Sequence, residues 1–294
     1  MPADPIKILL QTTITPTEND WSIARFSRLR ALLAGAVGPD GRPLYGVEAR
    51  DRGPLDAPDP VLSRLDQSDF DQLWLFAVDV GDGLTPQDCE AVSRFRASGG
   101  GMMVTRDHMD LGSSVCTLGG VGAAHHFHSK NPEPDTARHV RDDEETQYIS
   151  WPNYRSGANG DYQSIQALRP IHPVLVDPAS PTGTLRYLPA HPHEGAVMAP
   201  EAAQARVIAT GRSRTTGRGF NLAVAFERGA HGGAAIAQST FHHFADYNWD
   251  LSSGSPTFVS EIPGDGMARE PQALADTHRY ALNVAEWLGR RPKA

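Results

Sequence analysis

The sequence has few of the features that mark secreted or membrane-spanning proteins. It contains only two cysteines, Cys89 and Cys116, so no disulfide framework is expected and a reducing compartment is indicated. No stretch reaches the roughly 18 consecutive apolar residues of a membrane span. Residues 1–20 lack the basic segment and small-residue cleavage site of a signal peptide. We therefore expect a cytoplasmic protein that does not enter a membrane.

Positive charge is also scarce. The 294 residues include 27 Lys and Arg against 35 Asp and Glu, a formal net charge of −8 with all 12 His counted neutral. A nucleic-acid-binding surface normally has a basic face that neutralises phosphates, so this balance argues against such a partner. The local basic cluster of Arg212, Arg214 and Arg218 lies in GRSRTTGRG between two apolar runs, which predicts a solvated hairpin tip.

The first half of the chain alternates short apolar runs with segments of helical period. That alternation is typical of strands and crossover helices in a parallel sheet. A capping-box pattern at Thr85 and Asp88 predicts the start of one helix, and Asp20 is a candidate cap for an earlier one. The predicted strands are residues 6–12, 45–49, 73–80 and 102–105, and the predicted helices are residues 23–33, 61–65 and a segment beginning at residue 85.

The second half is predicted to be rich in strands, with candidates at residues 184–188, 205–209, 220–226 and 234–238 before a final amphipathic helix at 273–288. Residues 129–163 show little periodicity and contain several aromatic side chains, so they predict an irregular insertion or lid. Its aromatic residues either stack on a ligand or pin the loop to the body. Length alone allows two domains, but we expect a single domain over residues 1–294.

Polar residues follow the predicted strands where a ligand pocket would form. In an open parallel sheet, ligands gather outside the carboxyl ends of the strands. Thr13 follows the first strand, Asp79 the third, and Asp107 and His108 the fourth. The last predicted strand is followed by Thr240, His242, His243 and Asp246. We expect these side chains to converge at one edge of the sheet.

The histidines form three local clusters, in AHHFHS, HPHEG and STFHHFADYNWD. Imidazoles beside carboxylates suit either metal ligation or proton transfer, since both need a lone pair near neutral pH. On a strand, His191 and His193 would face the same way and could bind a cation with Glu194 or His243. The spacing matches no known metal signature, so hydrogen-bonding loop histidines remain the alternative.

Cys116 is a second candidate reactive group because a cysteine with a nearby histidine can act as a nucleophile. A class I amidotransferase places its cysteine on a tight turn directly after a strand. In this sequence His108 follows the strand MMVTRD at that position, and Cys116 comes eight residues later in SSVCTLGG. A small buried residue on a helix is the competing interpretation of Cys116.

Six segments, taken in order, resemble the trehalose-utilisation (ThuA-like) family of the class I glutamine amidotransferase-like superfamily. They are LDQSDFDQLWLF, LTPQDCEAVSRFRASGGGMMVTRDH, LGGVGAAHHFHS, IHPVL, GGAAIAQSTFHH and RYALNVAEWLGRR. The resemblance implies a flavodoxin-like α/β fold: a mostly parallel sheet with helices on both faces, a long loop insertion and a β-rich C-terminal half. It also implies a histidine, His108, in place of the nucleophilic cysteine, and a small polar, sugar-like substrate. HPHEG and FHHFADYNWD depart from the family pattern.

These observations lead to one main hypothesis and two alternatives. The main hypothesis is an enzyme that performs hydrolysis or elimination on a small polar substrate, with a divalent metal such as zinc as its only candidate cofactor. The alternatives are a non-catalytic ligand-binding domain and a hydrolase that uses Cys116. The small molecule is the only partner we expect besides a second copy of the chain. The assigned residues are His108, Glu194, His242 and Asp246 for proton transfer; Thr13, Asp79, Asp107, His126, His128, Trp151 and Tyr154 for substrate binding; and His191, His193 and His243 for the metal.

Overall fold

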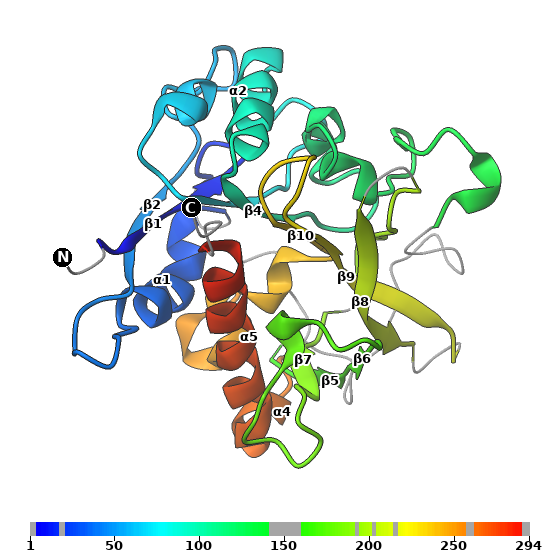
Figure 1. Cartoon of the computed structure of the whole chain (residues 1–294). Helices are drawn as coiled ribbons and strands as arrows, with labels where there is room; N and C mark the ends of the chain where they lie inside the picture. Colours follow the sequence, from blue (N-terminus) through cyan, green and yellow to red (C-terminus); the bar gives the residue numbers. More distant parts are fainter. Residues whose placement is uncertain are drawn as a thin grey trace.

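A mixed sheet forms the centre of the structure (Figure 1). The computed structural model describes residues 4–17, 21–140, 160–191, 194–201, 204–213, 217–256 and 262–289. Within these residues the sheet has eight strands in the order β2-β1-β3-β4-β10-β9-β8-β6. They are β1 (Ile6–Thr12), β2 (Tyr45–Arg50), β3 (Gln72–Phe76), β4 (Gly101–Thr105), β6 (Gln166–Ala167), β8 (Ala205–Arg212), β9 (Gly219–Phe226) and β10 (Ala235–Gln238). Neighbours from β2 to β10 are parallel, whereas β9, β8 and β6 continue the sheet antiparallel.

Helices cover both faces of this sheet. Helix α2 (Pro86–Ala97) packs on one face, while α1 (Ser27–Ala34) and α5 (Pro271–Gly289) pack on the other (Figure 1). The alternation of side chains along β1 shows this directly, because Ile8 and Leu10 join the cluster containing α1 and α5, whereas Leu9 joins the cluster containing α2. A strand buried on both faces reads as a continuous apolar run. The short helices are α3 (Asp246–Trp249) and α4 (Gly266–Arg269).

The first half of the chain largely agrees with the predicted elements. The capping box of α2 is present, with the Asp88 N–H donating to Thr85 Oγ1 at 3.2 Å. Ser22 caps the 3-10 helix Ile23–Phe26 that leads into α1, whereas Asp20 lies outside the described residues. The predicted strand 73–80 is too long, since β3 ends at Phe76. Beyond it Val80 is 64% exposed, so an apolar residue continues the pattern after the chain has left the sheet.

The second half agrees for β8, β9, β10 and α5, differs at residues 184–188, and contains the short edge strand β6, which was not predicted. Residues 184–188 were predicted to form a strand, but β7 covers Tyr187–Pro189 and pairs with β5 (Tyr162–Ser164) in a separate antiparallel sheet. Thr184 makes only an isolated bridge to Val176. The predicted insertion begins with an irregular segment containing the 3-10 helix Thr136–Arg138, and its last residues enter β5. Residues 141–159 of that insertion lie outside the described residues.

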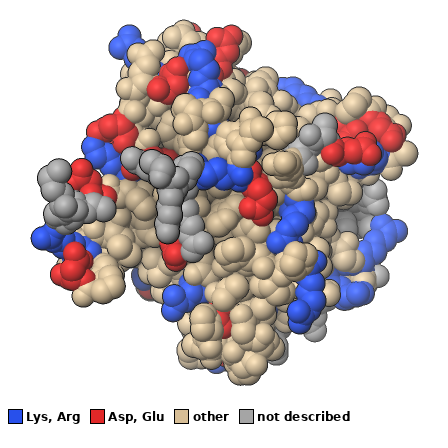
Figure 2. All heavy atoms as spheres, in the orientation of Figure 1, with Lys and Arg blue, Asp and Glu red and all other residues tan. Residues whose placement is uncertain are grey.

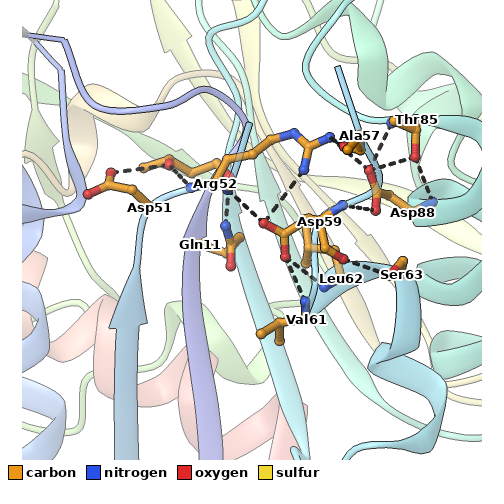
Figure 3. A network of polar contacts seen from close by, with 12 residues as sticks. Gln11, Asp51, Arg52, Ala57, Asp59, Val61, Leu62, Ser63, Thr85 and Asp88 are labelled. Atoms are coloured by element: carbon orange, nitrogen blue, oxygen red, sulfur yellow. Dashed lines mark hydrogen bonds and ion pairs between the residues drawn. The ribbon is translucent and has the colours of Figure 1, made fainter. Parts of the chain in front are cut away.

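A buried network of charges fills the carboxyl edge of the sheet at β1 and β2 (Figure 3). The side chains of Arg52, Asp59 and Asp88 are all 0% exposed. Arg52 Nη2 donates to Asp88 Oδ2 at 3.0 Å, and Arg52 Nη1 lies 3.5 Å from Asp59 Oδ2. Asp59 Oδ1 also accepts hydrogen bonds from Arg50 Nη1 and from the N–H groups of Val61 and Leu62. These contacts join the loop after β2 to the start of α2.

One face of the molecule carries charged side chains of both signs. Figure 2 shows Lys and Arg side chains interspersed with Asp and Glu over one face of the molecule. Among the described residues, no helix combines the length and the apolar character that crossing a bilayer requires.

Candidate functional site

Three side chains that can ligate a metal meet at the carboxyl edge of the sheet. Asp107 follows β4, His191 follows β7, and His242 lies in the 3-10 helix Phe241–His243 after β10. One ligand atom from each residue can be chosen so that all three lie within 4.8 Å of one another. For Asp107 and His242 this convergence is the one expected for loops that follow neighbouring parallel strands, β4 and β10, whereas His191 comes from the separate sheet of β5 and β7.

The residue types of this Asp107–His191–His242 group suit a small divalent cation. The rings of His191 and His242 stack with centroids 3.2 Å apart and an interplanar angle of 13°, so one ring would have to turn for both to direct a nitrogen at the same ion. Asp107 Oδ2 and His242 Nε2 are 3.7 Å apart. Two ligands on a tetrahedral zinc with bonds of ~2.0–2.1 Å would be about 3.3 Å apart. Two imidazoles and one carboxylate are a donor set that zinc and other divalent transition metals accept. Three protein ligands also leave a position for water or substrate.

Burial and mutual contacts set the protonation of the group. Burial lowers the pKa of His242, which keeps the imidazole neutral and its lone pair available, although the Asp107 carboxylate opposes this shift. For Asp107, burial would raise the pKa, but the contacts with His108 and His242 hold it well below its usual range. A carboxylate and a neutral imidazole are the forms that bind metals.

His108 stands at the rim of the group. Its Nδ1 lies 3.2 Å from Asp107 Oδ1, and its side chain is 16% exposed, compared with 9% for those of Asp107 and His242. The next residue, Met109, has φ of 54°, a left-handed conformation that is uncommon outside glycine. The Met109 carbonyl accepts a hydrogen bond from the buried Arg106 guanidinium, which helps to hold this turn. The fold therefore places an imidazole on a tight turn directly after β4, as predicted.

Tyr247 contacts His242 on the side of the ring away from Asp107. The Tyr247 hydroxyl lies 2.7 Å from His242 Nδ1, so Nε2 is the nitrogen that faces Asp107. Asn248 Nδ2 donates to the His242 carbonyl at 2.9 Å. Such outer contacts fix the ring and tautomer of a metal-ligating histidine. Tyr247 and Asn248 were not predicted as site residues, although both lie in the motif FHHFADYNWD.

A second buried network joins the two segments that carry His191 and His242. His243 Nε2 lies 3.1 Å from Glu194 Oε1, and Ser239 Oγ donates to Glu194 Oε2 at 2.7 Å. Gln163 Nε2 also donates to Glu194 Oε1, at 2.6 Å. The sequence analysis assigned Glu194 to proton transfer and His243 to a metal; the structure places them beside each other in this network.

The tautomer of His243 follows from its other neighbours. The buried Tyr280 hydroxyl donates to Gln238 Oε1 at 2.6 Å, and burial raises the pKa of Tyr280 above its usual range, so it remains a donor. Gln238 Nε2 therefore faces His243 Nδ1, at 2.7 Å, and donates to it. His243 then carries its proton on Nε2 and donates to Glu194. Gln163, Gln238 and Tyr280 were not predicted because they lie far apart in the sequence.

Asp246 lies on the side of α1. Its carboxylate accepts hydrogen bonds from the Ser27 N–H at 3.1 Å, from Ser27 Oγ at 2.5 Å and from the Arg28 N–H at 2.9 Å. The first N–H groups of a helix have no partner within the helix, so an acceptor there stabilises its start. Asp246 also lines a cavity of about 270 Å³ with Trp21 and Arg25.

The remaining predicted residues lie around the edge in different roles. Thr13 Oγ1 accepts from the Val78 N–H at 3.2 Å, and Asp79 accepts from the Ser114 N–H and hydroxyl. His126 is buried, and burial lowers its pKa to about 4, whereas His128 is exposed. Trp151, Tyr154 and His193 lie outside the described residues.

Cys116 is poorly suited to act as a nucleophile. It lies in the 3-10 helix Ser113–Thr117, and its Sγ is 3.0 Å from the Lys130 carbonyl. Burial raises the pKa of the thiol to about 11, so very little thiolate exists near neutral pH.

In a Cys89→Ala variant, native Cys116 should therefore react with iodoacetamide at pH 7.5 about 10²-fold more slowly than the same chain in denaturant. Mass spectrometry of timed samples measures both rates. Equal rates in the folded and unfolded chain would reinstate Cys116 as a reactive group.

The fold is an α/β fold with a mostly parallel sheet between helical layers and polar loops gathered at the carboxyl edge of the sheet. It is similar to a protein named as ThuA-like from Parabacteroides merdae, with a TM-score of 0.51 and 13% identity over 97% of this chain and 90% of that one. It also aligns with the glutaminase domain of Trypanosoma brucei CTPS, with a TM-score of 0.40 and 12% identity over 97% of each chain. No family model and no curated protein matches the sequence. The expected resemblance to ThuA-like proteins is thus confirmed for the fold.

Proposed function

We propose that the protein is a metal-assisted enzyme that performs hydrolysis or elimination on a small polar substrate. The observation that carries this proposal is the Asp107–His191–His242 group, whose ligand atoms converge within 4.8 Å from three separate segments. Each of these residues is no more than 7% exposed. Groups that are buried together and have perturbed pKa values concentrate at functional sites.

Each residue of the proposed site has a separate role. Asp107, His191 and His242 would hold the cation, Tyr247 fixes the ring of His242, and His108 transfers a proton at the rim of the group. A bound divalent metal would lower the pKa of a water molecule and polarise a substrate oxygen. Asp107 Oδ1 holds His108 Nδ1, which directs the Nε2 of His108 away from Asp107. Proton transfer then occurs at His108 Nε2.

The Glu194–His243 network acts as a positioning element in this proposal. It joins the segment after β7 to the segment after β10, and these segments supply His191 and His242 respectively. Asp246 acts through α1, which it caps. The resemblance to ThuA-like proteins supports a sugar-like substrate, and Thr13, Asp79, His126 and His128 lie in loops around the same region.

The test is turnover as a function of metal. The purified protein is stripped with a chelator and reloaded separately with Zn²⁺, Mn²⁺ or Mg²⁺, and each form is assayed on acetylated sugars, aryl glycosides and sugar lactones. We expect turnover of one substrate class to disappear on chelation and to return with one metal. Turnover that survives complete metal removal would contradict the proposal. Tight metal binding without turnover on any class would favour the non-catalytic ligand-binding alternative.

A further inference from the structure

Arg96 is a buried cation without a carboxylate partner among the described residues. It lies on α2, is 5% exposed, and uses its Nε to donate to the Gly233 carbonyl at 3.2 Å. Its guanidinium carbon lies 5.3 Å from the centre of the Phe226 ring. The side chain makes no ion pair with a described residue. Its two terminal nitrogens donate no hydrogen bond to a described residue. An arginine remains charged under all physiological conditions, so this charge is buried uncompensated.

Comparison with Arg52 shows how unusual this is. Arg52 is also buried, at 2% exposed, but it meets two carboxylates, Asp59 and Asp88. For Arg96, burial lowers the pKa, and no acidic side chain counters that effect. A buried charge normally has a partner, and the described residues supply none to Arg96, which leaves the position beside its guanidinium open to a ligand.

Arg96 lines a cavity of about 410 Å³. The cavity lies between α2, the turn containing Gly120 and the end of β9, and apolar residues such as Ala97, Ala123 and Phe226 form much of its wall. Its volume is typical of pockets for small molecules. The turn lies close to the guanidinium, since a Cβ at Gly120 would come within 2.7 Å of Arg96 Nη1 and would displace the end of that side chain. Gly120 also has φ of 78°, which favours glycine.

We propose that this cavity binds a small organic anion, whose carboxylate or phosphate group pairs with Arg96 and whose apolar part packs against Phe226 and Ala97. Arginine presents a planar fork of donors that matches both anionic groups. Glu227 also lines the cavity, but its carboxylate is paired with His172 and not with Arg96: Glu227 Oε1 lies 3.4 Å from His172 Nε2. The cavity shares no lining residue with the Asp107–His191–His242 group, so this inference is independent of the proposed enzymatic function.

The test measures binding of benzoate, phenyl phosphate and the neutral analogue benzamide by isothermal titration calorimetry at low ionic strength. We expect at least one anion to bind with a Kd of about 1 mM or tighter, and benzamide to bind at least about tenfold more weakly. Tighter binding of phenyl phosphate would identify phosphate as the preferred group, and tighter binding of benzoate would identify carboxylate. Equal binding of benzamide, or no binding of either anion at about 10 mM, would overturn the proposal.

Three variants locate the binding. Arg96→Met should weaken anion binding at least about tenfold, whereas the matched control Arg94→Met should leave it unchanged. Arg94 is on the same helix, but its side chain is 54% exposed and already paired with Asp66. Ala97→Phe fills the cavity from its exposed rim with Arg96 in place, and should also abolish binding. Thermal melts establish that each variant is folded. Undiminished anion binding in folded Arg96→Met or Ala97→Phe would place the anion elsewhere and refute the assignment.

Discussion

Replacing His108 with glutamine is expected to lower kcat by about 10²–10⁴-fold on the best substrate, the usual contribution of a general acid or base. Glutamine keeps a polar side chain at the rim but cannot transfer a proton at neutral pH. His108 contacts Asp107 but is not itself one of the Asp107–His191–His242 group. The metal content of the variant should therefore stay at the wild-type value. Steady-state kinetics and elemental analysis of the same preparation measure both quantities.

His231→Gln is the matched control for this prediction. His231 is exposed and lies before β10, at the opposite end of that strand from His242, so its replacement should leave kcat unchanged. Full turnover in folded His108→Gln would remove the proton-transfer role. A kcat loss accompanied by loss of the metal would instead assign His108 to metal binding.

Truncating Asp59 to alanine is expected to lower the free energy of unfolding by about 3–5 kcal/mol, the usual cost of breaking a buried ion pair. The change removes the acceptor for Arg50, for Gly53 and for the first N–H groups of the following 3-10 helix (Figure 3). It also leaves the buried Arg52 with Asp88 as its one carboxylate partner among the described residues. Urea unfolding followed by circular dichroism measures the loss.

Asp69→Ala provides the comparison, because it removes a carboxylate paired with Lys7 at the surface, where the side chain is 73% exposed. Its unfolding midpoint should remain that of the wild type, since exposed pairs are screened by solvent. An unfolding curve for Asp59→Ala that overlays that of Asp69→Ala would show that the buried network contributes little.

The same network gives the protein an acid limit. Burial would raise the pKa of Asp59, but the hydrogen bonds from Arg50 and from backbone N–H groups outweigh it and lower the pKa below 3.8. The stability that this carboxylate contributes is therefore complete above pH 3.8 and is lost as the pH falls through the lowered, folded-state pKa. In Asp59→Ala this part of the acid unfolding should be absent.

Local patterns predicted most elements of the fold. The continuous apolar run of β1 and the Thr85–Asp88 capping box specify their elements within a few residues, and both are present. The errors fall at strand boundaries that depend on which segments pair with each other. Nothing in LWLFAVDV shows that β3 stops at Phe76, because that boundary depends on where the loops after neighbouring strands begin. Residues 184–188 have strand propensity, but their partner β5 pairs with Tyr187–Pro189.

The candidate site was predictable residue by residue but not as a group. Position after a strand identified Asp107, His108 and His242, and residue type identified His191. Their arrangement depends on contacts between segments separated by tens of residues, and those contacts leave no local pattern. From the sequence His243 was assigned to the metal and His242 to proton transfer. In the structure His242 lies with His191 and Asp107, and His243 lies beside Glu194.

The central claim is that Asp107, His191 and His242 hold one divalent cation, and metal stoichiometry tests it most directly. Wild-type protein, Asp107→Asn and the double variant His191→Asn/His242→Asn are loaded with Zn²⁺, desalted and analysed for bound metal. Asp246→Asn serves as the control, since its carboxylate caps α1. The account predicts about one zinc per chain in the wild type and the control, and little or none in the other two. Zinc retained in full by the folded double variant, or absent from the loaded wild type, would contradict it.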